Sequence, residues 1–190
     1  KGKKVLITGH SGFKGSWLSY WLKEIGAEVF GYSLKPITIP NHFDLLKSDL
    51  KSSYNNICDL NRFKKFINET NPEIIFHLAA QPLVRQSYID PIETYQTNVI
   101  GTANLLESIK NNQFVKAVIV ITTDKCYKNL NQSQGYKESD ILGGYDPYSS
   151  SKACVELLVS SFRDSFFNIK EYGNKHQILI STARAGNVIG

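Results

Sequence analysis

A tyrosine and a lysine four residues apart are the first side chains in this sequence that suggest chemistry. Tyr148 and Lys152 stand in "DPYSSSKACVELL", and Pro147 just before them predicts the start of a helix. Residues four apart share one helix face, so the phenol and the ammonium point the same way. A nearby ammonium stabilises the phenolate and is expected to lower the pKa of the tyrosine. Tyr148 can therefore act as a base toward a hydroxyl group whose carbon gives up a hydride.

Three glycines at a spacing of three form a second candidate site near the start of the chain. Gly9, Gly12 and Gly15 lie in "GHSGFKGSWL", and the apolar run "KKVLITG" predicts a buried strand before them. A helix that begins at this loop would direct its first N–H groups at a pyrophosphate. Glycine also lets the backbone approach phosphates without a Cβ in the way. The loop therefore predicts a dinucleotide-binding site that includes the intervening residues His10, Ser11, Phe13 and Lys14, the last either a charged contact or a surface lysine.

The elements around these two sites alternate between strands and helices. Apolar, β-branched runs predict six strands, within "KKVLITG", "AEVFGYS", "NNIC", "EIIFHLAA", "KAVIVITT" and "QILISTARA". Helices are predicted after the glycine loop, around residues 63–67, over residues 92–110 and from residue 147 to about 167, while residues 36–54 have no clear period. Such alternation is typical of an α/β fold with a Rossmann-type, doubly wound parallel sheet. The first helix is expected to turn one apolar stripe to the core: Trp17, Leu18, Trp21, Leu22 and Ile25.

The second predicted strand ends without the acidic residue that usually binds the adenosine ribose of a dinucleotide. Ser33 stands at that position, and Lys35 nearby would tolerate a 2′-phosphate, so these residues leave the choice between NAD and NADP open. Asp59 follows the third predicted strand, where its carboxylate can bind the adenine amino group or cap the next helix. We predict that Asp59 and its neighbour Leu60 contact the cofactor.

Length and composition indicate one large domain or part of a longer protein. The chain has 190 residues, of which 42% are hydrophobic and 12% aromatic, enough for a packed core. It contains no methionine and stops at "ARAGNVIG", directly after an apolar run. We therefore expect residues 1–190 to be the NAD(P)-binding Rossmann domain of a longer enzyme. This domain would carry the catalytic residues, with the C-terminal substrate domain missing from the chain.

Charge, cysteine and hydropathy patterns exclude several other classes. The net charge of +5 comes with dispersed lysines, which is typical of solvated surface rather than a nucleic-acid-binding patch. No apolar run reaches the roughly 20 residues that cross a bilayer, and no secretory signal opens the chain. Three cysteines and four histidines show no metal-binding or redox spacing. The sequence predicts a cytoplasmic protein that binds no metal, no nucleic acid and no membrane.

Four motifs that follow one another on these elements resemble the extended short-chain dehydrogenase/reductase superfamily. They are the glycine loop, Asn98 in "TNVIGT", the "TTD" of residues 122–124 and the Tyr148–Lys152 pair. The resemblance covers the whole chain, and it implies that Asn98 holds a proton-relay water through the helix backbone. It implies that Thr123 hydrogen-bonds the sugar near the reacting hydroxyl. It also implies contacts with the cofactor ribose, or at the junction of cofactor and substrate, by five further residues: Leu78, Ala79, Ala80, Arg184 and Asn187.

Within this superfamily, the segment "TTDKCY" is similar to the sugar-nucleotide 4,6-dehydratase branch. Dehydratases of this branch carry Thr-Asp-Glu here, and the epimerases do not, whereas this chain has Thr123, Asp124 and Lys125. The lysine, together with "GHSGFKGSWL", "HLAAQPLVRQSY" and "GGYDPYSSSK", is similar to the CDP-glucose 4,6-dehydratases. This resemblance implies CDP-glucose as the nucleotide-sugar substrate, and NAD as a tightly held, recycled cofactor. It also implies a product used for bacterial surface deoxysugars, as in lipopolysaccharide, and a homodimer built through the helices near residues 92–110 and 148–167.

The implied chemistry assigns one proton transfer to each of three residues. Tyr148 removes the proton of the C4 hydroxyl, Asp124 protonates the departing C6 hydroxyl, and Lys125 takes the C5 proton. The hypothesis requires a dry site that raises the pKa of Asp124, and burial beside Lys152 that lowers the pKa of Lys125. Two alternatives share the motifs: a sugar-nucleotide 4-epimerase, which does not need Asp124, and a non-catalytic dinucleotide sensor.

Overall fold

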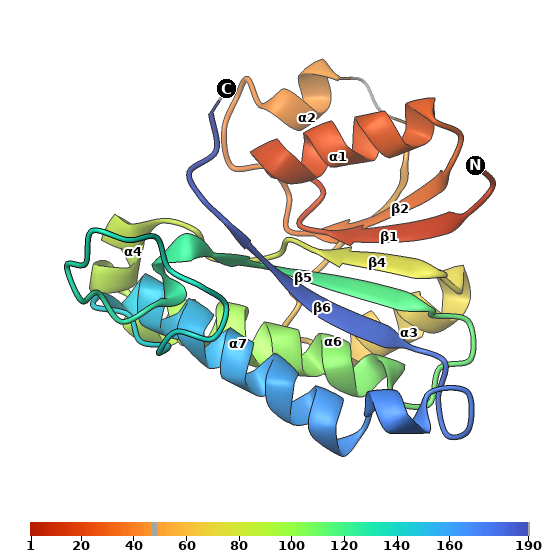
Figure 1. Cartoon of the computed structure of the whole chain (residues 1–190). Coiled ribbons are helices and arrows are strands. Elements are labelled where there is room, and N and C mark those ends of the chain that lie inside the picture. The colour runs from red at the N-terminus through yellow and green to blue at the C-terminus, as the bar shows by residue number, and fades with distance from the viewer. Residues whose placement is uncertain (47–48, 190) are drawn as a thin grey trace.

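Six parallel strands form one open sheet in the computed structural model, which describes residues 1–46 and 49–189 (Figure 1). The strand order is β3-β2-β1-β4-β5-β6, and every neighbouring pair is parallel. Because the chain extends outward from β1 in both directions, the sheet is doubly wound, and the predicted Rossmann-type fold is confirmed. The strand bounds are β1 Lys4–Thr8, β2 Glu28–Ser33, β3 Lys51–Tyr54, β4 Ile74–His77, β5 Ala117–Thr123 and β6 Leu179–Ala185.

Helices cover both faces of this sheet. Figure 1 shows α1 and α2 on one face, and α3, α6 and α7 on the other. A π-helical turn over Gln96–Ile100 joins α5 to α6, and 3₁₀ turns over Asp124–Cys126 and Ile169–Glu171 follow β5 and α7. In the described part of the chain, no helix is both long enough and apolar enough to span a membrane. The helix bounds are α1 Phe13–Glu24, α2 His42–Leu45, α3 Leu60–Thr70, α4 Val84–Ile89, α5 Pro91–Tyr95, α6 Gly101–Ile109 and α7 Pro147–Ser165.

The strand that precedes the glycine loop is buried on both faces. Side chains alternate along β1, so Leu6 joins the larger core against α3, α6 and α7, while Val5 and Ile7 join a smaller core under α1. All three side chains are at most 2% exposed. Burial of both faces is the pattern expected of a central parallel strand. It fixes the carboxyl end of β1, from which the glycine loop starts.

The first helix presents its apolar residues differently from the predicted stripe. Leu18 and Leu22 pack against the smaller core, but Trp17, Trp21 and Ile25 are 49%, 63% and 52% exposed. Residues four apart along a helix share a face, so these three lie together on the outer side. The prediction that all five face the core is therefore wrong. The helix instead turns three small residues inward, which permits a close approach to the backbone of the glycine loop: Gly15, Ser16 and Ser19.

Two predicted elements differ in the structure. The third strand is β3, and the predicted strand at residues 55–58 is a loop and turn. β3 is an edge strand with no fully buried residue, so its polar sequence "KSSY" carries no apolar signal. The segment 36–54 therefore contains α2 and β3, although residues 47–48 lie outside the described part of the chain. The predicted helix over 92–110 is interrupted by the π-helical turn, and α4 is too short to show a period.

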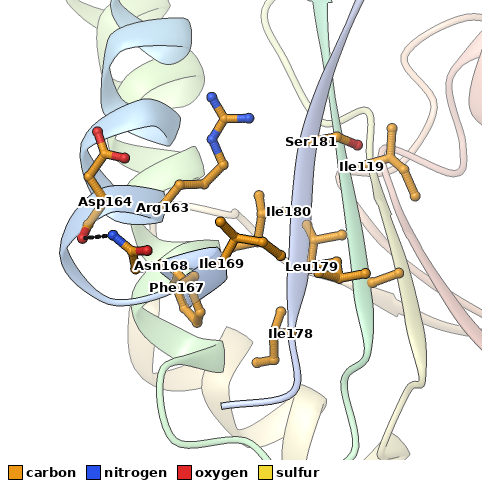
Figure 2. A pocket seen from close by; sticks show the side chains of 12 residues that line it. Ile119, Arg163, Asp164, Phe167, Asn168, Ile169, Ile178, Leu179, Ile180 and Ser181 are labelled. Carbon is orange, nitrogen blue, oxygen red and sulfur yellow. Dashed lines mark hydrogen bonds between the residues drawn. The ribbon is translucent and has the colours of Figure 1, made fainter. Parts of the chain in front are cut away.

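A groove lies between the end of α7 and the first half of β6 (Figure 2). Phe167, Ile169 and Leu179 give it apolar walls, and Arg163 and Asp164 also line it. Ligands of open parallel sheets bind outside the carboxyl ends of the strands, and this groove is at the opposite end of β6. The candidate site therefore lies elsewhere, at the edge of the sheet where the glycine loop begins.

Candidate active site

The glycine loop makes a tight turn between β1 and α1. Gly9 has a φ of +72°, which glycine adopts without strain, and its N–H donates to Tyr32 O at 2.8 Å. A Cβ at Gly15 would lie 2.1 Å from Gly9 O, so the loop and the first turn of α1 pack backbone to backbone. Gly12 is the N-cap of α1 and brings no side chain to the first N–H groups. These groups can bind a phosphate, so the loop fits the pyrophosphate of a dinucleotide.

Two serine hydroxyls meet where the adenosine ribose is predicted to lie. Ser33 Oγ donates to Ser11 Oγ at 2.9 Å, and Ser11 Oγ donates to Leu34 O at 2.8 Å. These bonds tie the glycine loop to the end of β2. Asp59 caps α3 by accepting a hydrogen bond from Arg62 N at 3.0 Å, so the capping alternative is confirmed. Contact of Asp59 with the adenine stays a prediction.

The other predicted cofactor residues lie on the same edge of the sheet. Phe13 and Lys14 are exposed in the first turn of α1, and Leu60 begins α3. Residues 78–80 follow β4 directly, and a Cβ at Gly9 would lie 2.8 Å from the backbone nitrogen of Ala79. The ends of β1 and β4 are therefore in contact, and the segment "LAA" forms one wall of the glycine loop.

Two buried histidines lie beneath this edge of the sheet. His10 is 0% exposed, which leaves its ring no surface for the predicted contact with the cofactor, and burial lowers its pKa to about 4. His77 in β4 is hydrogen-bonded at both ring nitrogens, Nδ1 with Thr8 Oγ1 at 2.7 Å and Nε2 with Thr102 Oγ1 at 3.1 Å. Burial lowers the pKa of His77 to about 3, and the charge of Lys152 acts in the same direction. Both rings are therefore neutral at pH 7.

Acid is expected to destabilise the fold before its carboxylates titrate. The folded-state pKa values of both histidines are below the unfolded value of 6.5, so below that pH the unfolded chain takes up protons that the folded chain does not. The full stability is present above pH 7 and is lost as the pH falls toward the folded-state values. At pH 5 each histidine is expected to reduce the free energy of unfolding by about 2 kcal/mol relative to pH 7. Denaturant titrations at both pH values measure this loss.

A variant that cannot take up the proton distinguishes the contribution of His10 to the pH-dependence of stability from that of His77. His10→Gln should lose about half of the pH-dependence. His176→Gln, which removes a partly buried histidine at the opposite end of the sheet, should keep most of it. An equal free energy of unfolding at pH 7 and pH 5 in the unaltered chain would show that the buried rings take up protons without cost.

Tyr148 and Lys152 lie on one helix face, in the first turns of α7, as predicted. Lys152 is 7% exposed, and its Nζ donates to Ile121 O at 3.1 Å. Burial lowers the pKa of Lys152 to about 8, the charge of Lys14 acts in the same direction, and Glu156 opposes them. The charge of Lys14 therefore reaches Lys152, which is consistent with the first turn of α1 and the start of α7 lying near each other.

The pKa of Tyr148 moves in the direction opposite to the prediction. Burial raises it above the ordinary value of tyrosine, while hydrogen bonding with Thr123 and the charge of Lys125 offset only part of the rise. The expected lowering by the neighbouring ammonium is wrong, because removal of the phenol from water outweighs the nearby positive charge. Tyr148 is therefore protonated in the free site.

Asn98 lies in the π-helical turn, is 1% exposed, and fastens two other segments to that turn. Its Oδ1 accepts from Gln81 N at 2.8 Å, and its Nδ2 donates to Gln81 O at 3.2 Å and to Ser151 Oγ at 2.8 Å. Turns of this kind are frequent at functional sites. Neither Gln81 nor Ser151 is predicted from the sequence, because a buried polar partner leaves no periodic signal. The water-holding role of the Asn98 backbone stays a prediction.

The turn after β5 carries Asp124 and Lys125, and Thr123 caps it. Lys125 Nζ lies 3.0 Å from Asp124 Oδ1 and donates to Asn187 Oδ1 at 3.0 Å. The side chains of Asp124 and Lys125 are 51% and 47% exposed in this chain, so their burial in the full-length protein stays a prediction. A three-residue turn beyond the end of a strand leaves such side chains in solvent. The structure nevertheless gathers Asp124, Lys125 and Asn187 into one hydrogen-bonded group, whose two charges act on Tyr148.

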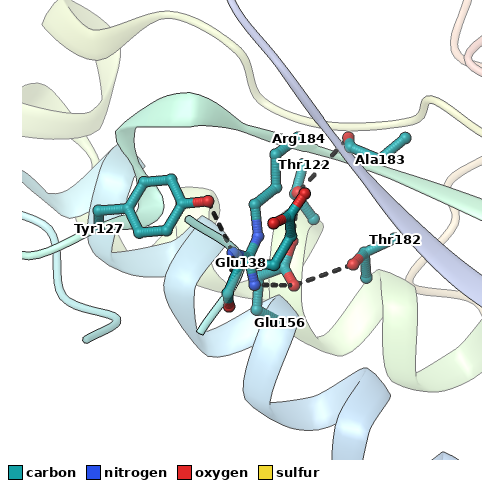
Figure 3. Close-up of polar contacts among 7 residues, drawn as sticks. All are labelled: Thr122, Tyr127, Glu138, Glu156, Thr182, Ala183 and Arg184. Atoms are coloured by element: carbon teal, nitrogen blue, oxygen red, sulfur yellow. Dashed lines mark hydrogen bonds and ion pairs between the residues drawn. The ribbon is translucent and has the colours of Figure 1, made fainter. Parts of the chain in front are cut away.

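The guanidinium group of Arg184 is bound to other residues of the protein. Its Nη2 lies 3.0 Å from Glu156 Oε2, and its Nη1 donates to Tyr127 Oη at 2.8 Å and to Glu138 O at 3.1 Å (Figure 3). These contacts do not place the guanidinium at the predicted junction of cofactor and substrate. Glu156, one helical turn after Lys152, is a residue of this region that the sequence pattern does not single out.

The fold, the glycine loop and the tyrosine–lysine pair agree with the result of a comparison with protein-family models. The model described as "GDP-mannose 4,6 dehydratase" matches residues 6–172. The chain belongs to this family of sugar-nucleotide enzymes, and the predicted resemblance to the dehydratase branch of the extended short-chain dehydrogenase/reductases is confirmed.

Individual relatives show how far the likeness extends. The chain is 53% identical to the CDP-glucose 4,6-dehydratase of Salmonella typhimurium over 192 aligned residues, which cover 100% of this chain and 53% of that protein. The structure of UDP-glucose 4-epimerase from Thermotoga maritima with UDP-glucose has a TM-score of 0.80 at 25% identity, covering 95% of this chain and 54% of that one. The dTDP-glucose 4,6-dehydratase of Bacillus anthracis in complex with NAD shares the fold, with a TM-score of 0.73 at 22% identity and the same coverage. The chain therefore spans about half the length of the relatives it matches.

Proposed function

We propose that the full-length protein is a lyase, a 4,6-dehydratase that converts CDP-glucose to CDP-4-dehydro-6-deoxyglucose and water. The observation that carries this proposal is the Asp124–Lys125 pair, 3.0 Å apart on the turn beside Tyr148. An epimerase needs proton transfer at the C4 hydroxyl, whereas a dehydratase also needs an acid for the C6 hydroxyl and a base for the C5 proton. The 53% identity with the Salmonella protein, whose name specifies CDP-glucose, supports this substrate.

We assign NAD to the glycine loop. The tight turn at Gly9 and Gly15 and the open N-terminus of α1 fit a pyrophosphate, and the hydroxyls of Ser11 and Ser33 fit a ribose. Relatives of known structure, including the Bacillus anthracis protein, are described in complex with NAD. NAD bound here would accept a hydride from the sugar and later return it, while the protein places the sugar and moves its protons.

Three side chains divide the proton transfers. Tyr148 takes the proton of the C4 hydroxyl, and hydrogen bonding with Thr123 and the positive charge of Lys125 favour the phenolate that this requires. Asp124 and Lys125, which are in close contact, supply the acid for the C6 hydroxyl and the base for the C5 proton. One proton moved from the ammonium to the carboxylate turns this ion pair into a neutral acid and a neutral amine. The amine then takes the C5 proton, and the acid protonates the departing C6 hydroxyl, which restores the ion pair.

An assay of the full-length protein with CDP-, dTDP-, UDP- and GDP-glucose tests this function. We expect the fastest turnover with CDP-glucose, and a product that has lost one water by mass spectrometry. A product of unchanged mass would identify a 4-epimerase, the alternative that the fold shared with the Thermotoga protein supports. Binding of NAD without turnover of any of the four would identify a dinucleotide sensor. Faster turnover of another nucleotide sugar would overturn the choice of CDP-glucose but not the class of reaction.

We also propose that the full-length protein is a homodimer that pairs through α6 and α7. Leu157 and Phe166 at α7 and Ile100 before α6 are 60%, 46% and 51% exposed, which supports an apolar contact surface there. Leu105 and Leu106 on α6 are fully buried in the chain's own core and do not contribute to it. Three free, well-separated cysteines support a cytoplasmic location.

A further inference from the structure

A buried carboxylate, Glu156, lies on the same face of α7 as Lys152, one helical turn further on. It is 6% exposed; Thr122 Oγ1 donates to its Oε1 at 2.5 Å, and Thr182 Oγ1 donates to its Oε2 at 2.9 Å (Figure 3). Burial raises the pKa of Glu156, but hydrogen bonds from Arg184 and the two threonines together lower it below the ordinary value. Glu156 is therefore ionised, and both of its carboxylate oxygens are hydrogen-bonded within the protein.

Arg184 extends this interaction from α7 across β6 to the segment after β5. Its Nη2 contacts Glu156 at 3.0 Å, and its Nη1 donates to Tyr127 Oη at 2.8 Å. The guanidinium carbon also lies 4.9 Å from the centre of the Tyr127 ring, within the range of a cation–π contact. One arginine therefore links the helix that carries Tyr148 to the residue that directly follows the turn of Asp124–Cys126.

Tyr127 is well placed to hold that turn. It forms a β-bridge with Leu142, and the N–H of Gly143 donates to Cys126 O at 2.8 Å. The ring of Tyr127 stacks on Tyr136 with 4.8 Å between ring centres. The turn is thus held by the loop of Leu142 and Gly143 and, through Tyr127, by Arg184. The side chains of Asp124 and Lys125 on this turn are half exposed.

We propose that the Glu156–Arg184 ion pair is a positioning device for the elimination step, acting through Tyr127 on the turn that carries Asp124 and Lys125. This inference rests on the proposed dehydratase function. Asp124 and Lys125 can serve as acid and base only when the turn holds both at the C5–C6 bond. A misplacement of about 1 Å can cost on the order of 100-fold in rate.

The position of the C4 base depends much less on this ion pair. Tyr148 and Lys152 belong to α7, whose first turn is fixed by a capping box at Asp146 and by the contact of Ser151 with Asn98. Loosening the turn after β5 should therefore slow the loss of water more than it slows the first transfer of hydride from C4. A role in folding alone would leave the ratio of these two rates unchanged.

Two conservative variants of the full-length protein test the inference. Tyr127→Phe removes one hydroxyl and leaves the ion pair intact. Arg184→Lys keeps the positive charge, but a compact ammonium cannot hold both Glu156 and Tyr127 as the planar guanidinium does. In single turnovers of CDP-glucose, we expect reduced nicotinamide to form at nearly the normal rate and to accumulate, because water is released about 10- to 100-fold more slowly. Tyr172→Phe, at the opposite end of β6, is the matched control and should behave as the unaltered protein.

The outcomes are distinguishable from one another. Thermal unfolding and circular dichroism first establish that each variant is folded, and Tyr127→Phe decides the question if Arg184→Lys is not. An unchanged ratio of hydride transfer to water release in the folded variants would overturn the positioning role, whether both rates stay normal or fall together. Failure of the unaltered protein to release water from any nucleotide sugar would instead overturn the proposed function, before any variant is compared.

Discussion

Tyr148→Phe is expected to lower kcat for CDP-glucose by about 1,000-fold in the full-length protein, with little change in KM. Phenylalanine keeps the ring and its packing but removes the oxygen that, as phenolate, is proposed to accept the C4 proton. Because that transfer accompanies the first loss of hydride from the sugar, reduced nicotinamide should form about 1,000-fold more slowly in a single turnover. Rapid-mixing absorbance measurements detect this directly, and substrate binding is followed separately by calorimetry.

The same substitution elsewhere controls for a general effect of losing a phenol. Tyr172 follows the 3₁₀ turn after α7, far from the carboxyl ends of the strands, and Tyr172→Phe should keep normal kinetics. If Tyr148→Phe retained about a tenth or more of the original kcat, another group would have to be the C4 base, since general-base catalysis contributes at least about 100-fold.

Lys125→Ala should arrest the reaction one step later. The first transfer of hydride should slow only modestly, because Tyr148, its partner Thr123 and Lys152 are unchanged and only the favourable charge of Lys125 is lost. Removal of the amine takes away the C5 base and also the proton source for Asp124, so elimination should slow by about 100- to 10,000-fold. Reduced nicotinamide and the 4-keto sugar should accumulate, and exchange of the C5 hydrogen in heavy water should be far slower than in the unaltered protein.

Lys175→Ala is the matched control, because Lys175 also pairs with a nearby carboxylate on the surface, that of Glu171 at 3.5 Å. Its loss should change neither rate. C5 exchange and water release at normal rates in Lys125→Ala would show that Lys125 is not the base, and would pass the role to another group or to water. Asp124→Asn would then show whether the carboxyl group acts without its partner.

The parts of the site that the sequence predicts well are those set by the backbone. Glycine spacing between a strand and a helix is a local signal, and the loop at Gly9 and Gly15 has the expected close backbone contacts. The spacing of Tyr148 and Lys152 likewise fixes a shared helix face. Strand order then follows from the doubly wound topology, so these distant segments can be predicted to meet at one edge.

The parts that sequence does not predict depend on what surrounds each side chain. Spacing shows that Tyr148 and Lys152 are neighbours, but not that burial would outweigh the ammonium and raise the pKa of the phenol. Lys125 and Asp124 are adjacent to the apolar run of β5, yet the turn leaves both half exposed. Arg184 shows the same limit, because its partner Glu156 is 28 residues earlier and is brought to it only by the contact of α7 with β6.

The hydrogen bonds around His77 all run in one direction. The hydroxyl of Thr102 donates its only hydrogen bond to Asn98 O at 2.6 Å, so its oxygen accepts from His77 Nε2, and that nitrogen must carry the ring proton. Nδ1 then accepts a hydrogen bond from the hydroxyl of Thr8, whose oxygen in turn accepts one from Ala79 N. From Ala79 N to Asn98 O, the hydrogen bonds form one chain in which every donor points the same way, and each bond strengthens the next. A second proton on the imidazole would place a donor opposite the hydroxyl of Thr8 and break this chain of hydrogen bonds. Only the neutral ring therefore connects the wall of the glycine loop to the π-helical turn in this way.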